Sequence, residues 1–225
     1  MLVEFISLPG AGKTSIIQDI CNNPDYKDRI NLIGKKKCNR TSVITEIIIF
    51  FIKLVFIYPK ILLNIKSSLW LLKKISIRLC HRKNDIKDEV CLLNESGILM
   101  PIISFITQRD TNSYQINLNK IISVLPIPDV VVFIDCDIEI VIDRYADRGG
   151  PQTKGPGIRD EVIVSTKLYE RFASGQNALL ALKQILKRKK CIVITIRNNS
   201  LLDYEMIPFS LFNKLESKLQ LYKKF

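Results

Sequence analysis

Residues 7–14, Ser-Leu-Pro-Gly-Ala-Gly-Lys-Thr, constrain the fold of this chain more than any other segment. They end an apolar run, residues 2–8, that predicts a strand. Residues 13–21 follow, and the isoleucines at 16, 17 and 20 would share one face of a helix. A strand, a glycine turn and a helix in this order match the pattern G-x-x-x-x-G-K-[ST], with Ser7 in place of the first glycine. The segment is therefore predicted to be a phosphate loop.

Each residue type in this loop suits the binding of a nucleotide. Gly10 and Gly12 can adopt backbone angles that other residues avoid, so that successive N–H groups turn toward one anion. The helix that follows adds the positive end of its dipole. Lys13 is predicted to reach the β- and γ-phosphates, and the Thr14 hydroxyl is predicted to bind Mg²⁺. The predicted nucleotide-binding residues of the loop are Pro9, Gly10, Ala11, Gly12, Lys13, Thr14 and Ser15.

The rest of the chain alternates between short apolar runs and helical patterns. The runs have the continuous apolar character of strands that are buried on both faces of a parallel sheet, and they lie at 89–93, 130–134 and 192–196. The helical patterns lie at 114–124, 138–148, 162–187 and 208–223. This alternation predicts the α/β, three-layer fold of a P-loop NTPase, with a parallel sheet flanked by helices and a short arginine lid. A length of 225 residues suits a single domain, 1–225, with an apolar helical insertion at about 41–82 and a lid at about 149–161.

Three acidic residues follow predicted strands. Glu95 comes just after the run at 89–93, and ligands of parallel α/β sheets bind at the carboxyl ends of strands. Glu95 is therefore predicted to lie at the reaction centre, where it holds a water on Mg²⁺ or accepts the proton of an acceptor hydroxyl. The alternative is that it caps the helix that begins after Gly97. Asp137 is predicted to be a helix N-cap, and Asp135 is left open between bracing a loop and binding nucleotide.

Arginines flank a segment rich in glycine and proline at residues 149–157. Arg144 and Arg148 are four residues apart, so they share one helix face, and Arg159 follows the segment. This arrangement suits a lid that excludes water and brings guanidinium groups to phosphates. The alternative is a set of surface arginines that pair with the acidic residues at 143, 147 and 161.

Charge and cysteine content limit the classes of partner. The net charge of +12 implies attraction to anions, which include nucleotides, nucleic acid and acidic membrane surfaces. No basic strand carries interleaved aromatic residues, so nucleic acid is not a predicted partner. The six cysteines form no C-x-x-C pair and there is one histidine, His81, so no zinc-type ligand spacing exists. Reduced, buried thiols in a cytoplasmic protein are predicted.

Residues 43–72 are very apolar, with lysines at intervals. Pro59 interrupts the segment, which makes a helix that spans a membrane a poor fit. The favoured interpretation is a pair of helices that pack on the sheet and wall the acceptor site. Peripheral contact with a membrane through a basic amphipathic pair is the alternative. The oligomeric state, including a homodimer, is left open.

The chain resembles the thymidylate kinase and nucleoside monophosphate kinase group of P-loop kinases. The stretches that carry the resemblance are 4–15, 94–97, 128–150 and 159–161. It implies that the cofactors are ATP and Mg²⁺, with Thr14 and Glu95 near the metal and Arg144 at the ATP phosphates. It also implies a catalytic set of Lys13, Glu95, Arg148 and Arg159.

The chain departs from this group where the acceptor should bind. Thymidylate kinases carry an Asp-Arg pair where this chain has Asn94, Glu95 and Ser96, so the arginine that grips an acceptor phosphate is missing. The sequence Asn-Glu-Ser-Gly is also similar to P-loop kinases that act on sugars and other small hydroxyl compounds. The expected activity is therefore transfer of the γ-phosphate of Mg·ATP to a small-molecule acceptor. The alternative is a membrane-associated NTP-binding switch or ATPase.

Overall fold

A central parallel sheet organises the chain. The computed structural model describes residues 2–25, 30–33, 44–57, 59, 69, 72, 90–93, 97, 99–107, 114–125, 127–147, 161–189 and 191–222. The sheet has five strands in the order β2-β3-β1-β4-β5, and every neighbouring pair is parallel. The strands are β1 (Leu2–Ser7), β2 (Ile30–Ile33), β3 (Val90–Leu93), β4 (Val130–Asp135) and β5 (Ile192–Arg197). Because all strands run the same way, their carboxyl ends meet at one edge, where ligands bind in such sheets.

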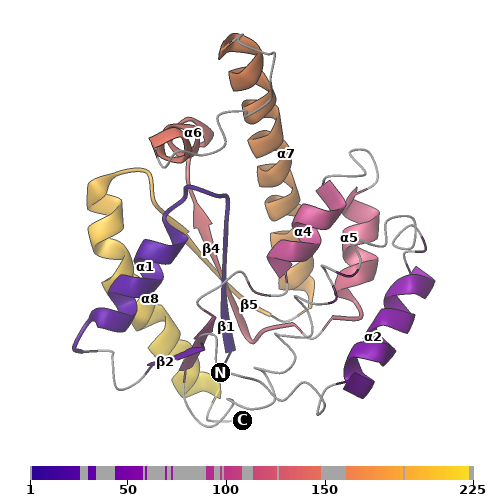
Figure 1. Cartoon of the computed structure of the whole chain (residues 1–225). Helices are drawn as coiled ribbons and strands as arrows, with labels where there is room; N and C mark the ends of the chain where they lie inside the picture. The colour runs from indigo at the N-terminus through magenta and orange to yellow at the C-terminus, as the bar shows by residue number, and fades with distance from the viewer. Residues whose placement is uncertain are drawn as a thin grey trace.

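Helices cover both faces of the sheet (Figure 1). One face is covered by α1 (Lys13–Asn22) and α8 (Leu201–Tyr222), and the other by α4 (Leu99–Thr107), α5 (Tyr114–Ile122) and α7 (Glu161–Arg188). Helix α6 (Ile138–Asp147) lies beyond the carboxyl end of β4, and α2 (Ile44–Ile57) lies beside α5. The predicted three-layer α/β fold is therefore confirmed, while its lid at about 149–161 falls outside the described residues apart from Glu161.

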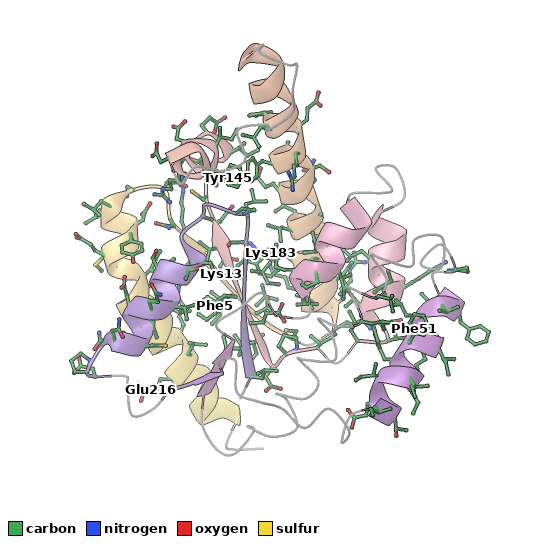
Figure 2. The ribbon with its side chains drawn as sticks, viewed as in Figure 1. Phe5, Lys13, Phe51, Tyr145, Lys183 and Glu216 are labelled. Carbon is green, nitrogen blue, oxygen red and sulfur yellow. The ribbon has the colours of Figure 1, made fainter. Side chains whose placement is uncertain are left out.

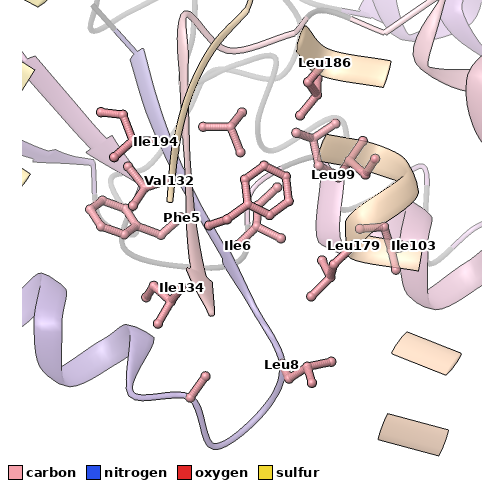
Figure 3. Packing of buried hydrophobic residues seen from close by; sticks show 14 of the residues in the cluster. Phe5, Ile6, Leu8, Leu99, Ile103, Val132, Ile134, Leu179, Leu186 and Ile194 are labelled. Atoms are coloured by element: carbon pink, nitrogen blue, oxygen red, sulfur yellow. The ribbon is translucent and has the colours of Figure 1, made fainter. Parts of the chain in front are cut away.

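The core consists of two apolar layers, one on each side of the sheet (Figure 2). Successive side chains of a strand point to opposite faces, so Phe5 and Ile6 of β1 enter different layers. Figure 3 shows Phe5 beside Val132 and Ile194 on one side of β1, and Ile6 toward Leu99 on the other. Both faces of β1 and β4 are buried, which explains why these strands read as continuous apolar runs.

One strand was not predicted, and the start of one helix was predicted wrongly. Strand β2, Ile30–Ile33, was not predicted, because four residues alone carry no periodicity and its strand state comes from pairing with β3. Helix α8 begins at Leu201, not at residue 208. Ser200 and Asp203 form a capping box that starts the helix: the Asp203 N–H donates to Ser200 Oγ at 3.0 Å, and the Ser200 N–H donates to Asp203 Oδ2 at 3.2 Å.

The apolar segment at 43–72 is described mainly through α2. This helix buries Phe50 and Leu54, while Phe56 is 82% exposed. The other exposed apolar residues of α2 are Ile44, Ile48, Ile49 and Ile52. None of the helices in the described part of the chain is both long and apolar enough to cross a membrane. Of the second predicted helix, only Pro59, Leu69 and Leu72 fall within the described residues.

Candidate functional site

The phosphate loop, residues 7–14, joins the carboxyl end of β1 to α1. It turns sharply at two glycines with positive φ, 94° at Gly10 and 85° at Gly12, and the Ala11 N–H donates to the Leu8 carbonyl at 3.2 Å. Both glycines are also closely packed. A Cβ at Gly10 would lie 2.8 Å from the Val141 carbonyl oxygen, and one at Gly12 would lie 2.6 Å from an amide nitrogen of Asn198. Backbone angle and space therefore both require glycine at these positions.

The N-terminus of α1 is suited to an anion. Gly12 is the N-cap residue, no side chain caps the helix, and no acidic residue lies in the first turn. Lys13 is half-buried and Thr14 is exposed at this helix start, which Figure 2 shows below the helix that carries Tyr145. A helix N-terminus without an acidic cap combines backbone donors with the positive end of the dipole. This geometry favours the binding of phosphate at the loop.

Two turns join the loop at the same edge of the sheet: the β4–α6 turn (residues 136–137) and the β5–α8 turn (residues 198–200). The Asn198 N–H donates to the Asp135 carbonyl at 2.9 Å, and the Asp137 N–H donates to Asn199 Oδ1 at 2.9 Å. The carboxylate of Asp137, in the predicted N-cap position of α6, accepts the Asn199 side-chain amide and lies 3.6 Å from Arg197. These bonds hold the two turns together as one surface beside the loop.

Asn198 connects this surface to the phosphate loop. Its Nδ2 donates to the Ala11 carbonyl oxygen at 2.9 Å, and the residue is only 1% exposed. Its own carbonyl oxygen accepts Arg144 Nη1 at 3.1 Å and the Cys136 thiol at 3.1 Å. Sequence reasoning missed Asn198. The available signal was that it directly follows a strand, as Asp135 ends the neighbouring one.

The structure brings together part of the predicted site. The predicted loop residues 9–15 and Arg144 lie at one end of the sheet, with Arg144 bound to the β5–α8 turn. Glu95, Arg148 and Arg159 lie outside the described residues, so their predicted roles remain predictions.

A buried carboxylate near the predicted position of Glu95 was also missed. Glu4 of β1 is 1% exposed, and its Oε1 accepts the Leu99 N–H at the start of α4 at 2.9 Å. Its carboxyl group also packs against Gly97. A side-chain oxygen at a helix N-terminus is favourable because it accepts a hydrogen bond from an N–H group that has no partner within the helix. Glu4 thereby anchors the start of α4, four residues after Glu95, to the central strand.

Gly97→Ala tests this anchor. A Cβ at residue 97 would lie 1.8 Å from the Glu4 carboxyl carbon, so the buried carboxylate must shift from the position in which it accepts the Leu99 N–H. We expect a loss of about 3 kcal/mol in the free energy of unfolding, from overpacking plus a weakened hydrogen bond. Urea unfolding measures it.

Gly175→Ala in α7 is the matched control. Its Cβ would approach only a terminal methyl of Leu8, at 3.0 Å, and alanine favours the helix. We expect little loss of stability, and equal losses for the two variants would contradict the anchoring role of Glu4.

The described cysteines are thiols in partly or fully buried positions. Burial raises the pKa of Cys21 and Cys136, and it raises the pKa of Cys191 to about 12. A raised pKa keeps the thiol protonated at neutral pH, and the protonated Cys136 can donate to Asn198. Among the described residues, no group of three or more His, Cys, Asp or Glu side chains could hold a metal ion.

Solved structures provide the comparison with known proteins. No protein-family model and no curated protein matches this sequence. The thymidylate kinase of Candida albicans superposes with a TM-score of 0.54 at 14% identity, over 96% of this chain and 91% of that one. Two structures of deoxyadenosine kinase from M. mycoides, one with dCMP and a flexible dCDP and one with dCTP, superpose with TM-scores of 0.51 and 0.50 at 16% identity. Both cover 96% of this chain and all of the other. The chain therefore has the three-layer α/β fold of the P-loop nucleoside and nucleotide kinases, the group that its sequence resembles.

Proposed function

We propose that this protein is an ATP-dependent phosphotransferase that moves the γ-phosphate of Mg·ATP to a small-molecule acceptor. The observation that carries the proposal is the phosphate loop, with positive φ at Gly10 and Gly12 and no side-chain cap on α1. It lies at the carboxyl edge of a parallel sheet, where such folds bind ligands. The likeness to deoxyadenosine kinase and thymidylate kinase in fold supports the same reaction class.

The residues at the start of α1 fit a nucleotide with its metal. Lys13 would lie against the β- and γ-phosphates, and the exposed Thr14 would offer a hydroxyl oxygen, the kind of ligand that Mg²⁺ prefers. Bound Mg²⁺ neutralises charge on the phosphates during transfer. Arg144, which lies at the same edge of the sheet, adds a permanent positive charge near the loop.

We further propose that Glu95 accepts the proton of the acceptor hydroxyl. The hydroxyl oxygen then bonds to the γ-phosphorus, the bond to the β–γ bridging oxygen breaks, and ADP leaves. Three observations support this role: β3 ends at Leu93, β3 runs parallel to β1, and Glu4 anchors the chain at Leu99. Glu95 thus follows a strand whose carboxyl end lies at the edge where the phosphate loop begins.

We propose a nucleoside as the acceptor, in preference to a nucleoside monophosphate. The structural neighbours include both a deoxyadenosine kinase and a thymidylate kinase. This chain has Asn94, Glu95 and Ser96 after β3, so a carboxylate stands where an arginine would bind an acceptor phosphate. A carboxylate suits a neutral hydroxyl, whose proton it can take, and repels a phosphate dianion.

Transfer of labelled γ-phosphate from Mg·ATP tests the proposal. The panel contains the four deoxynucleosides, their 5′-monophosphates and simple sugars, each at equal concentration, with a reaction lacking acceptor as the baseline. We expect labelled product with at least one deoxynucleoside, and little with its monophosphate. If only the monophosphates gave labelled product, the proposal that the acceptor is a nucleoside would be wrong. Hydrolysis at the same rate with and without every acceptor would contradict the kinase proposal and favour an NTP-binding switch.

A further inference from the structure

We infer that Asn198 is a positioning residue that sets the shape of the phosphate loop and ties it to Arg144. The inference rests on the proposed function, since it concerns how the loop holds Mg·ATP. Asn198 lies in the β5–α8 turn, 187 residues away from Ala11 in sequence, yet its side chain bonds to the backbone of that loop residue. No role follows for it from the phosphate-loop motif itself.

The side-chain amide of Asn198 packs directly over the turn of the loop. Its Nδ2 bonds to the Ala11 carbonyl at 2.9 Å, and both groups are buried. The same nitrogen occupies the space that a Cβ at Gly12 would need, at 2.6 Å. Asn198 therefore fixes the direction of one loop carbonyl and closes the space on one side of Gly12. Both effects hold the peptide units on either side of Gly12, whose N–H groups would face a phosphate.

The environment of the amide oxygen, Asn198 Oδ1, indicates that asparagine is not present at this position mainly for stability. Asn198 Oδ1 is buried, and within the described part of the chain it has no hydrogen-bond partner. A buried acceptor without a partner costs free energy, because its bonds to water are lost and not replaced. The gain from the bond to Ala11 is thus offset by the cost of Oδ1. Removing the whole amide should change stability little while it frees the loop.

The backbone of Asn198 carries the connection onward to α6. Its carbonyl oxygen accepts Arg144 Nη1 at 3.1 Å, and its N–H donates to the Asp135 carbonyl at 2.9 Å. The bonds thus run from Ala11 through Asn198 to Arg144, and each is a direct contact. A shift of the loop therefore moves the carbonyl oxygen that holds the Arg144 guanidinium. The effects of changes in the phosphate loop and at Arg144 on Mg·ATP binding should therefore be coupled.

Binding of Mg·ATP to Asn198→Ala and Asn198→Asp, measured by calorimetry, tests the inference, with thermal unfolding recorded for each variant. Asn198→Ala should weaken Mg·ATP binding about tenfold, the equivalent of one lost hydrogen bond, and leave the acceptor KM unchanged. Asn198→Asp should weaken it further, because a carboxylate cannot donate to Ala11 and repels phosphates. This extra loss should shrink as salt is raised. Asn199→Ala, which removes an amide from the same turn, is the control for general loosening.

A double-mutant cycle with Arg144→Ala tests the coupling, since the combined loss of affinity should be smaller than the product of the two single losses. The inference is overturned if both Asn198 variants bind Mg·ATP like the parent, or if their losses merely follow their melting temperatures as in Asn199→Ala. Additive losses in the cycle would overturn the link to Arg144. A parent protein that binds no nucleotide would instead overturn the proposed function, and this inference with it.

Discussion

Replacing Lys13 with alanine is expected to reduce turnover of Mg·ATP to below about 1% of the parent rate, without loss of the fold. Lys13 is the first residue of α1, beside a loop whose two glycines have positive φ. The variant removes the cation predicted at the β- and γ-phosphates, where charge develops during transfer, and such groups are worth two or more orders of magnitude in rate. Steady-state turnover and calorimetric binding of Mg·ATP measure the effect.

Lys187→Ala is the matched control for this change. Lys187 is exposed in the last turn of α7, just before β5 begins, so it lies at the edge of the sheet opposite the phosphate loop. Lys187→Ala removes the same charge as Lys13→Ala but no predicted contact with a nucleotide. Its turnover of Mg·ATP should therefore equal that of the parent. If Lys13→Ala also turned over Mg·ATP like the parent, the assignment of residues 7–14 as a nucleotide site would be wrong.

Glu95→Gln is expected to lower the rate of phosphoryl transfer by about 10²–10⁴-fold, the range of a lost general base. The change keeps the size of the side chain and its capacity for hydrogen bonds, but it removes the charge and the ability to take a proton. The affinity for Mg·ATP should therefore stay close to that of the parent. Single-turnover transfer to the best acceptor separates the chemical step from binding.

Two comparisons decide the role of Glu95. Glu170→Gln removes the same charge at an exposed position of α7 and should leave transfer unchanged. Equal losses of Mg·ATP affinity and of transfer rate would show that Glu95 holds the metal or the fold, and does not accept the proton.

The features that were predictable from sequence are local ones. The phosphate loop could be identified because its contacts to phosphate come from contiguous residues, and because backbone angles near φ 90° at positions 10 and 12 favour glycine. Strands β1 and β4 could be identified because both faces of each are buried, which leaves a continuous apolar run. Helix α6 and most of α7 followed from helical periodicity, which depends only on neighbours three and four residues away.

The misplaced start of α8 and the unpredicted strand β2 have separate physical causes. Pro208 suggested a helix start, since proline lacks the N–H that a helix interior uses. The reciprocal bonds of Ser200 and Asp203 start α8 earlier instead, and the Asn199 N–H holds the pKa of the Asp203 carboxyl below its usual value. Strand β2 owes its state to pairing with β3, which is far along the chain.

The residues that join the site together could not have come from local patterns. Asn198 meets Ala11 across 187 residues, and Glu4 meets Leu99 across 95. In the sequence, a buried polar residue looks like a polar interruption of an apolar run or like an ordinary loop residue. Its hydrogen-bond partner depends on the order of strands in the sheet, which local patterns do not show. That order, β2-β3-β1-β4-β5, brings the ends of β3, β4 and β5 to the phosphate loop. Adjacent residues of the sequence therefore determine the chemistry of the phosphate loop, whereas the hydrogen bonds from distant residues that shape the loop form only when the parallel sheet forms.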